Sequence, residues 1–543
     1  MTVVVAWRTH LCFHHPLLYH IRHCSNSVVA VASTTEHKEE GHLPVINSAS
    51  KKEKVVNGET KAPEWKKLDA EELGISNSMI SRPTRVVLNG LKKKGYEVYL
   101  VGGCVRDLIL KRIPKDFDVI TSAELKQVRK AFHRCEIVGK RFPICHVHLD
   151  DAIVEVSSFS TSQLKSDGKF NGNVRKPRGC SERDFIRWRN CLQRDFTING
   201  LILDPYANIV YDYMGGITDI KKTKVRTIIP ANLSFVEDSG RILRAIRIAA
   251  RLHFGFSRDL ALSLKELSHS VLRLDKGRIL LELNYMLAYG SAEASLRLMW
   301  RFGLLEILLP IQASYFVSQG FRRRDERSNM LLSLFSNLDR LVAPDRPCHS
   351  SLWLGIFAFH KALVDQPQDP LVVTAFSLAV HSGGSLLESV EIARRISQPY
   401  KSSFPELLEA RNPDSNNALV HKTINFAALV KTALCNMTDG CYVSKAMAKY
   451  PKAPSSDLVF IPMALFLRVS KIFECVRRGM EARFVHRQGR KIDYESLAMG
   501  SLEEYTIPDS VSFITLCLKQ ALDGGFCSNP SSQSPATNPK VVQ

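Results

Sequence analysis

Several features that would mark a membrane-spanning, disulfide-bonded or covalently catalysing protein are missing from this sequence. No run of about twenty apolar residues occurs in its 543 residues, so we expect no membrane-spanning helix. The 13 cysteines form no C-x-x-C pair, and the nearest two, Cys435 and Cys441, lack the spacing and neighbouring partners of a zinc site. Reduced, mostly structural thiols are therefore predicted. No Ser-His-Asp constellation is apparent either.

Acidic residues are scarce relative to basic ones. The chain has 54 Asp and Glu against 74 Lys and Arg, a formal net charge of +20. Such a balance favours a polyanionic partner, with a membrane surface as the plainer alternative. No acid precedes Glu36, and the residues before it combine arginine, histidine and serine with apolar patches. This composition is typical of a mitochondrial or chloroplast transit peptide, so residues 1–64 are predicted to be a transit peptide and a disordered linker.

An apolar segment, 96–101, runs into the glycine pair Gly102 and Gly103. Glycine lacks a Cβ, so its backbone N–H group can approach a ligand closely. The residues after the pair read as a helix, whose positive end favours phosphate oxygens, and Arg106 would add a fixed cation. By itself the pair leaves two interpretations open, a phosphate site and an ordinary strand–turn–helix connection.

Two acids follow shortly afterwards, Asp116 and Asp118, among apolar residues that indicate a strand. Side chains alternate along a strand, so both carboxylates are predicted to point the same way. Close carboxylates repel each other unless a cation lies between them, and Mg²⁺, or Mn²⁺, is the natural occupant. Glu155, in the apolar segment 153–156, is a candidate third ligand, with exposure to solvent as the alternative. The combination predicts a site for a nucleoside triphosphate and its metal.

With these residues, the chain resembles the class II nucleotidyltransferases of the DNA polymerase beta superfamily. That family contains the bacterial-type poly(A) polymerases and the CCA-adding tRNA nucleotidyltransferases. The resemblance covers about residues 80–260 well. It implies that residues 102–118 bind the triphosphate of the incoming nucleotide, with ATP as substrate. It also implies that Asp116 and Asp118 are the catalytic residues and hold two metals.

A second stretch, 194–199, reads Arg-Asp-Phe-Thr-Ile-Asn and resembles the family motif RRDFTIN. Gln193 stands where the family often has a first arginine. In the family, the arginine and aspartate help to select ribose and to position the sugar. The resemblance therefore implies that Arg194, Asp195 and Asn199 bind the nucleotide.

The helix predicted over 237–247 begins with two acids, which favour a helix N-terminus. Asp238 and Arg241 are three residues apart and so neighbours on the helix, where they offer acceptors and donors that can read a base edge. The segment resembles the family's E-D-x-x-R helix, in which these residues bond the incoming base, although Gly240 and Ile248 are unusual there. A solvated helix with ordinary ion pairs is the alternative. The nucleotide-binding residues implied on this helix are Asp238, Arg241, Arg244 and Arg247.

The segment 137–147 helps to predict which nucleotides the chain would add to RNA. It resembles the poly(A) polymerase pattern of a basic turn entering a strand with a histidine, in which Lys140 and Arg141 would hold RNA or phosphate. Against this, Ser160 stands where bacterial poly(A) polymerases often have arginine. We predict transfer of AMP from ATP to the 3′ ends of RNA, mRNA or tRNA. CCA addition to tRNA and a non-catalytic RNA-binding relative are the alternatives.

The resemblance and the hydrophobic periodicity together predict an α+β fold. A nucleotidyltransferase head with a DNA polymerase beta-like mixed sheet precedes an all-α neck and body. Basic clusters in the neck and body are candidate RNA-binding surfaces, and no protein partner can be named. The predicted boundaries are 65–210 for the head, 211–330 for the neck (entered through a family-like turn at 212–219), 331–525 for the body and 526–543 for a disordered tail. The candidate RNA-binding residues are Arg322, Arg323, Arg477, Arg478, Arg483 and Arg487.

Overall fold

The computed structural model describes most of the chain between residues 65 and 486. The predicted transit peptide, linker and tail lie outside the described residues, as do Lys140, Arg141, Arg487 and the side chains of Arg477, Arg478 and Arg483. The described residues are 65–139, 143–149, 152–163, 176–177, 179–381, 386–396, 404–409, 415–448 and 460–486.

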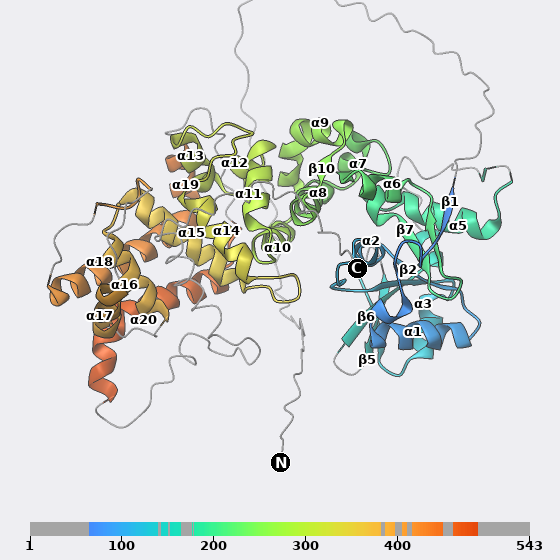
Figure 1. Cartoon of the computed structure of the whole chain (residues 1–543), viewed down its shortest axis with the longest axis horizontal. Coiled ribbons are helices and arrows are strands. Elements are labelled where there is room, and N and C mark those ends of the chain that lie inside the picture. The colour runs from blue at the N-terminus through green and yellow to red at the C-terminus, as the bar shows by residue number, and fades with distance from the viewer. Residues whose placement is uncertain are drawn as a thin grey trace, which may run out of the picture.

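A mixed sheet of eight strands forms the head, at the right of Figure 1. The strands lie in the order β1-β8-β7-β2-β3-β6-β5-β4. β3 and β6 run parallel, and the other neighbours pair antiparallel. The strands are β1 Lys66–Asp69, β2 Val98–Val101, β3 Asp118–Thr121, β4 Cys135–Val138, β5 Ile144–Leu149, β6 Ala152–Ser158, β7 Leu201–Asp204 and β8 Ile209–Asp212.

Helices cover both faces of the central strands. All four residues of β2 are buried, and alternate residues belong to different cores. Val98 and Leu100 join the core that includes α1 and α3, whereas Tyr99 and Val101 join the core under α5. The helices of the head are α1 Arg82–Lys93, α2 Gly103–Ile109, α3 Leu125–Ala131, α4 Phe159–Gln163, α5 Glu182–Leu192 and α6 Gly216–Lys221, with a 3-10 turn η2 at Thr197–Asn199.

The start of β3 differs from the sequence prediction. β3 begins at Asp118, so the placement of Asp116 on this strand was wrong. Val101, the last residue of β2, pairs with Asp118. After Val101 the chain turns away into α2. Asp116 therefore has no β2 residue opposite it and lies in a bend before the strand.

Beyond β8, the described residues form helices and one short parallel ladder between β9 (Lys224–Val225) and β10 (Gly255–Phe256). Figure 1 shows α7 to α11 between the head and a larger helical body. The predicted α+β fold, with a helical part after the head, is confirmed, while the exact domain boundaries stay predictions. The helices are α7 Ala231–Glu237, α8 Gly240–Leu252, α9 Arg258–Leu267, α10 Lys276–Leu287, α11 Ala292–Arg301, α12 Leu305–Leu308, α13 Pro310–Ser318, α14 Met330–Leu341, α15 Ser350–Asp365, α16 Pro370–His381, α17 Leu386–Ile396, α18 Asn416–Thr438, α19 Gly440–Met447 and α20 Met463–His486.

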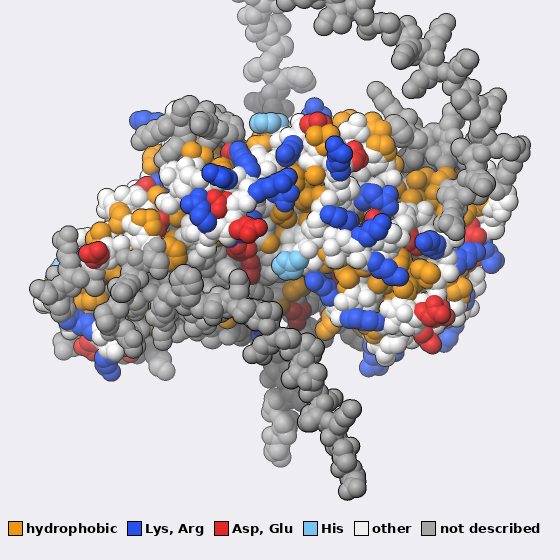
Figure 2. Space-filling view, turned by 45° about the horizontal axis from the view of Figure 1, so that its top comes forward, with side chains coloured by type: hydrophobic (Ala, Val, Ile, Leu, Met, Phe, Trp, Pro, Cys, Tyr) orange, Lys and Arg blue, Asp and Glu red, His pale blue; other side chains and the backbone are white. Residues whose placement is uncertain are grey.

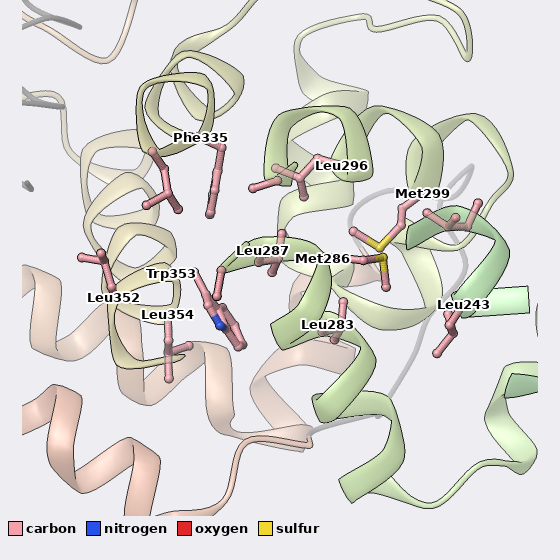
Figure 3. Packing of buried hydrophobic residues seen from close by; sticks show 14 of the residues in the cluster. Leu243, Leu283, Met286, Leu287, Leu296, Met299, Phe335, Leu352, Trp353 and Leu354 are labelled. Carbon is pink, nitrogen blue, oxygen red and sulfur yellow. The ribbon is translucent and has the colours of Figure 1, made fainter. Parts of the chain in front are cut away.

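None of the helices in the described part of the chain has both the length and the apolar character that crossing a bilayer requires. Instead, the apolar faces pack on one another. α10 lies at the centre of this packing: Leu283, Met286 and Leu287 are fully buried among residues of α8, α11 and α15 (Figure 3). Trp353 of α15 also donates a hydrogen bond from Nε1 to Oδ1 of Asn284 on α10, at 3.1 Å. The apolar side of α10 is thus fixed, and its polar side is held in one orientation.

Candidate functional site

The turn after β2 is built for a close approach to the backbone. Gly102 has a φ of 83°, which L residues with a side chain rarely adopt. A Cβ at this position would lie 2.8 Å from Nη1 of Arg194 and 3.1 Å from Oδ2 of Asp118. Glycine is therefore required both by the backbone conformation and by space. One guanidinium and one carboxylate therefore lie against the side of Gly102 that a side chain would cover.

Arg194 has one donor without a partner, in addition to the Nη1 atom that lies against Gly102. Its Nε is buried and has no hydrogen-bond partner within the described part of the chain. A buried donor without a partner costs free energy, so a ligand that accepts from it would bind favourably. An oxygen of a phosphate group fits this requirement, because phosphate is anionic and guanidinium groups recognise it with several donors.

Three carboxylates, Asp116, Asp118 and Glu155, lie near enough to one another to interact electrostatically. Asp118 of β3 lies directly opposite Glu155 of the parallel strand β6. Burial raises the pKa of Asp118 to about 6; Glu155 and Asp116 add to the rise, and Arg194 opposes it. The pKa of Glu155 is also raised, by burial and then by Asp116. The side chain of Asp116 is largely exposed, and that of Glu155 is half-exposed.

These carboxylates fit a hard divalent cation. Repulsion among them disfavours the charged forms, and a cation would relieve it. No trio of His, Cys, Asp or Glu with the spacing of a complete metal cage occurs among the residues described. Mg²⁺ needs no such cage, since it binds through one or two carboxylates and keeps its other positions for water and phosphate. Asp116 and Asp118 would hold it, with Glu155 beside them.

A row of polar residues continues from Asp118 across the sheet. Glu155 lies opposite His146 of β5, and His146 lies opposite Glu136 of β4. The Nε2 atom of His146 is 3.7 Å from Oε1 of Glu155. Since opposite residues share a face, the row lies on the same face as Asp118. His146 is therefore a neighbour of Glu155 on this face.

Arg106 is engaged within the protein. It is buried, donates from Nε to Oδ1 of Asp107 at 2.9 Å and donates from Nη1 to Oδ1 of Asn199 at 2.7 Å. The prediction that Arg106 holds phosphate remains a prediction, but the structure gives it a second task. It links α2 to η2, the turn that carries Asn199.

The polar chain that begins at Arg106 extends into the neck. Asn199 donates from Nδ2 to Oδ1 of Asp195 at 2.9 Å, and Arg244 of α8 donates from Nη1 to Oδ2 of Asp195 at 3.0 Å. Burial opposes ionisation of Asp195, but Arg244 and Asn199 nevertheless lower its pKa. On α10, Glu282 accepts from Nε of Arg247 at 2.8 Å and lies 4.0 Å from Nε of Arg244. The head and the neck are therefore joined by charged hydrogen bonds.

Asp238 and Arg241, predicted to act together on a base, have different partners. Arg241 is buried and donates to Oγ of Ser234 at 3.0 Å and to the Gln193 carbonyl oxygen at 3.3 Å. Asp238 accepts from Nη2 of Arg278 at 2.9 Å. The C-terminal end of α5, the start of α8 and α10 are thereby tied together.

Arg278 and Glu282 were missed by sequence reasoning. They lie one helical turn apart on α10 and hold Asp238 and Arg247. The sequence signal is weak, because Arg-x-x-x-Glu is a common surface pattern of helices. Only the packing of α10 against α8 gives the pair its partners.

The two predicted RNA-binding residues in the neck, Arg322 and Arg323, differ in their contacts within the protein. Arg323 stacks on Trp300, with its guanidinium carbon 4.1 Å from the ring centroid, and pairs with the buried carboxylate of Glu306. This arginine therefore supports the fold locally. Arg322 is exposed. Figure 2 shows Lys and Arg side chains outnumbering Asp and Glu over the middle of the molecule.

Comparisons with known proteins agree with this geometry. Residues 98–226 match the poly A polymerase head domain, and residues 253–316 match a probable RNA and SrmB-binding site of polymerase A. Poly(A) polymerase I of Haemophilus influenzae is 32% identical over 283 residues, which is 51% of this chain and 61% of that protein. The enzyme of the same name from Escherichia coli O6:H1 is 31% identical over 331 residues, 59% of this chain and 67% of that protein.

A CCA-adding enzyme is also similar. That of Streptococcus uberis is 28% identical over 245 residues, covering 45% of this chain and 57% of that protein. The chain thus spans between a little over half and two thirds of the length of these relatives.

Proposed function

The chain belongs to the family of poly(A) polymerases and CCA-adding tRNA nucleotidyltransferases, and from this we propose that it adds AMP from ATP to the 3′ ends of RNA. The observation that carries the proposal is the turn at Gly102, where a Cβ would lie 2.8 Å from Nη1 of Arg194 and 3.1 Å from Oδ2 of Asp118, so that a guanidinium and a carboxylate face the same place. A group that accepts hydrogen bonds from the first and shares a cation with the second is a metal-bound triphosphate.

Each of the residues at this site would have a separate role in nucleotide transfer. Gly102 lets the triphosphate approach the backbone, and Arg194 donates to its oxygens. Asp116 and Asp118 would hold Mg²⁺, which when bound neutralises phosphate charge and favours ionisation of the RNA 3′ hydroxyl. A bond then forms between that 3′ oxygen and the α-phosphorus, and pyrophosphate leaves. No protein nucleophile is needed.

The second candidate is CCA addition to tRNA, which uses the same chemistry. Two observations favour AMP addition. The poly(A) polymerase relatives are 31–32% identical, against 28% for the CCA-adding enzyme of S. uberis. In the sequence, the basic residues Lys140 and Arg141 and the following His146 also resemble the poly(A) polymerase pattern.

Primer extension tests the proposal. One primer is an unstructured RNA and the other a tRNA without its CCA end, each supplied with Mg²⁺ and ATP, CTP or both. Long products on the plain RNA with ATP alone are expected. Addition of only three nucleotides to the tRNA, with CTP required first, would instead establish CCA addition. If wild type is as inert as an Asp116→Ala, Asp118→Ala variant but still binds RNA, the chain is a non-catalytic relative.

RNA binding is proposed for the basic neck and body. Arg322 is exposed and belongs to a chain with a net charge of +20, so it is suited to contact phosphate. Arg322→Ala should weaken RNA binding and reduce its salt dependence, while ATP binding is unaffected. Unchanged salt dependence would refute this role.

We also propose that residues 1–64 direct the chain to an organelle, on the basis of their composition alone. A fusion of these residues to a fluorescent protein should enter mitochondria or chloroplasts. A fusion that stays in the cytosol would refute the proposal.

A further inference from the structure

Lys115, in the loop between α2 and β3, contacts an aromatic pair in the neck. Its Nζ atom lies 5.1 Å from the ring centroid of Tyr285 on α10 and 5.1 Å from that of Tyr289, in the turn after α10. The two ring centroids are themselves 5.1 Å apart. Residues four apart are neighbours along a helix, so the two rings form one aromatic surface, here called the tyrosine pair. The tyrosine pair faces the loop that leads into β3.

This surface lies beside an acid of the candidate metal site. The Nζ atom of Lys115 is also 3.9 Å from Oδ2 of Asp116. The ammonium group of Lys115 therefore links the tyrosine pair to the Asp116 carboxylate. The side chain of Asp116 is 72% exposed, that of Lys115 is 37% exposed, and both tyrosines are half-buried. A substrate held at Asp116 is thus only one side chain away from the two rings.

The part of the substrate that belongs here is the 3′ end of the RNA. In the proposed reaction its 3′ hydroxyl attacks beside the cation that Asp116 and Asp118 would hold, while the triphosphate lies toward Gly102 and Arg194. The base of the terminal nucleotide is attached to the same sugar as that hydroxyl, so it lies close to Asp116 as well. An unpaired base at an RNA end has exposed ring faces, and proteins bind such bases by stacking aromatic side chains on them.

A base can replace Lys115 on the tyrosine pair. The cation–π contact of a partly exposed lysine is weak, and stacking of a base on an aromatic ring is the stronger interaction. The ring of Tyr285 has a second contact, because the guanidinium carbon of Arg247 lies 5.1 Å from its centroid and Arg247 donates to Glu282 at 2.8 Å. Tyr285 therefore stays in place when Lys115 leaves it. The released ammonium group is then available to a phosphate group.

We propose that Tyr285 and Tyr289 bind the base of the 3′-terminal RNA nucleotide by stacking, and that Lys115 pairs with the phosphate of that nucleotide. The inference rests on the proposed function and names the residues that place the attacking end of the RNA. Every base has a ring face, so this contact holds RNA ends of any sequence. The contrasting role is a structural tie, in which Lys115 only joins the head to the neck. In that case the terminal base would have no effect on RNA binding.

Three variants separate stacking from a structural tie. Tyr285→Leu combined with Tyr289→Leu removes both rings, and Tyr285→Phe combined with Tyr289→Phe keeps them. Lys115→Met breaks the cation–π contacts and leaves the rings. The matched control is Tyr206→Leu, which breaks a similar contact, since Nζ of Lys92 lies 5.2 Å from the Tyr206 ring centroid. Tyr206 lies in the hairpin between β7 and β8, at the end of the sheet away from the candidate metal site. Thermal unfolding of each full-length variant verifies that it is folded.

The measurement compares two short labelled RNAs that differ only at the 3′ end, one with a terminal adenosine and one with an abasic ribose. Fluorescence anisotropy gives the Kd of each RNA with Mg²⁺ and without ATP. The wild type should bind the adenosine-ended RNA about fivefold or more tightly than the abasic one, the contribution of one stacked base. This ratio should fall to about one in the leucine variant, because no ring remains to stack on. The phenylalanine variant and the control should keep the wild-type ratio.

Lys115→Met gives a different expected result. It should weaken the binding of both RNAs and reduce the salt dependence, because one phosphate contact is lost. It should keep or raise the ratio between the two RNAs, because a competitor for the rings has been removed. ATP binding should persist in the leucine variant, since the triphosphate lies toward Gly102 and Arg194.

The possible outcomes separate the inference from the proposed function. If the wild type extends both RNAs but binds them equally, or if the leucine variant keeps the wild-type ratio, the inference is overturned and the proposed function stands. A ratio lost equally in Lys115→Met and in the leucine variant indicates a structural tie and has the same meaning. Loss of ATP binding in the leucine variant would assign the rings to the incoming nucleotide and also overturn the inference. A wild type that extends neither RNA overturns the proposed function and the inference with it.

Discussion

Removal of Glu282 tests the polar connection between head and neck. Its side chain is 8% exposed, accepts from Nε of Arg247 at 2.8 Å and lies 4.0 Å from Nε of Arg244. Glu282→Ala leaves both arginines without this counter-charge. The guanidinium of Arg247 also lies 5.1 Å from the ring centroid of Tyr285, so it has a second reason to remain where it is.

The expected cost follows from burial. Removing one partner of a buried ion pair costs about 3–5 kcal/mol, because a buried charge is left uncompensated. The side chains of Arg247 and Arg244 are 21% and 32% exposed, so water recovers part of this cost. Arg244 also retains Asp195 at 3.0 Å. We therefore expect the free energy of unfolding to fall by about 3 kcal/mol, the lower end of that range.

Urea unfolding, monitored by circular dichroism, measures the change in the free energy of unfolding. The matched control is Glu391→Ala, which removes the partner of Arg395 at 3.9 Å on α17, a pair in which both side chains are more than half exposed. Such a pair contributes about 0.3–0.5 kcal/mol. A Glu282→Ala variant that loses no more stability than this control would refute the assignment of Glu282 as a buried counter-charge.

Three further predictions concern other parts of the molecule. Asp118→Asn should abolish nucleotide transfer while RNA binding in a gel-shift assay persists, because a proposed ligand of the cation is lost. Burial, with a smaller effect of Lys361, lowers the pKa of His360 to about 3. Since the unfolded value is about 6.5, unfolded chains bind more protons, and stability should fall by roughly 1.4 kcal/mol per unit as pH drops from 6.5 towards 3. His360→Phe should flatten that slope, and an unchanged slope would contradict the argument. Arg187→Lys should destabilise the head by about 2 kcal/mol in urea unfolding, because ammonium cannot reproduce the planar contacts of Arg187 with Tyr99 and Asp184.

Parts of the site that depend on local rules were predictable. An apolar segment followed by two glycines is typical of a turn with positive φ, and Gly102 has a φ of 83°. The rarity of a charge in an apolar segment predicted that Glu155 could lie beside the acids, and β6 places it opposite Asp118. Helix start signals predicted α8 to within three residues, but the placement of the two acids on this helix was wrong: Glu237 ends α7, and Asp238 precedes the N-cap of α8, Ser239.

Partners across the fold were not predictable. The position of Asp116 depends on where β2 ends, which is a property of the neighbouring strand. A long arginine side chain can reach many acceptors, so its partner is decided by how helices pack. Arg106 reaches Asn199, which is 93 residues away, and Arg278 reaches Asp238, which is 40 residues away. The space at Gly240 that admits Arg278 is likewise visible only once α10 lies beside α8.

The connection from Arg106 to Glu282 also has a consequence for synthesis. Its hydrogen bonds join residues 93, 49 and 35 positions apart, so the polar cluster cannot assemble until the ribosome has released α10. Before α8 is made, Asp195 lacks Arg244, and before α10 is made, Arg247 lacks Glu282. A nucleotidyltransferase of this kind would become competent only after about half of its chain has been made, so a shorter nascent chain would have little opportunity to act on nearby RNA.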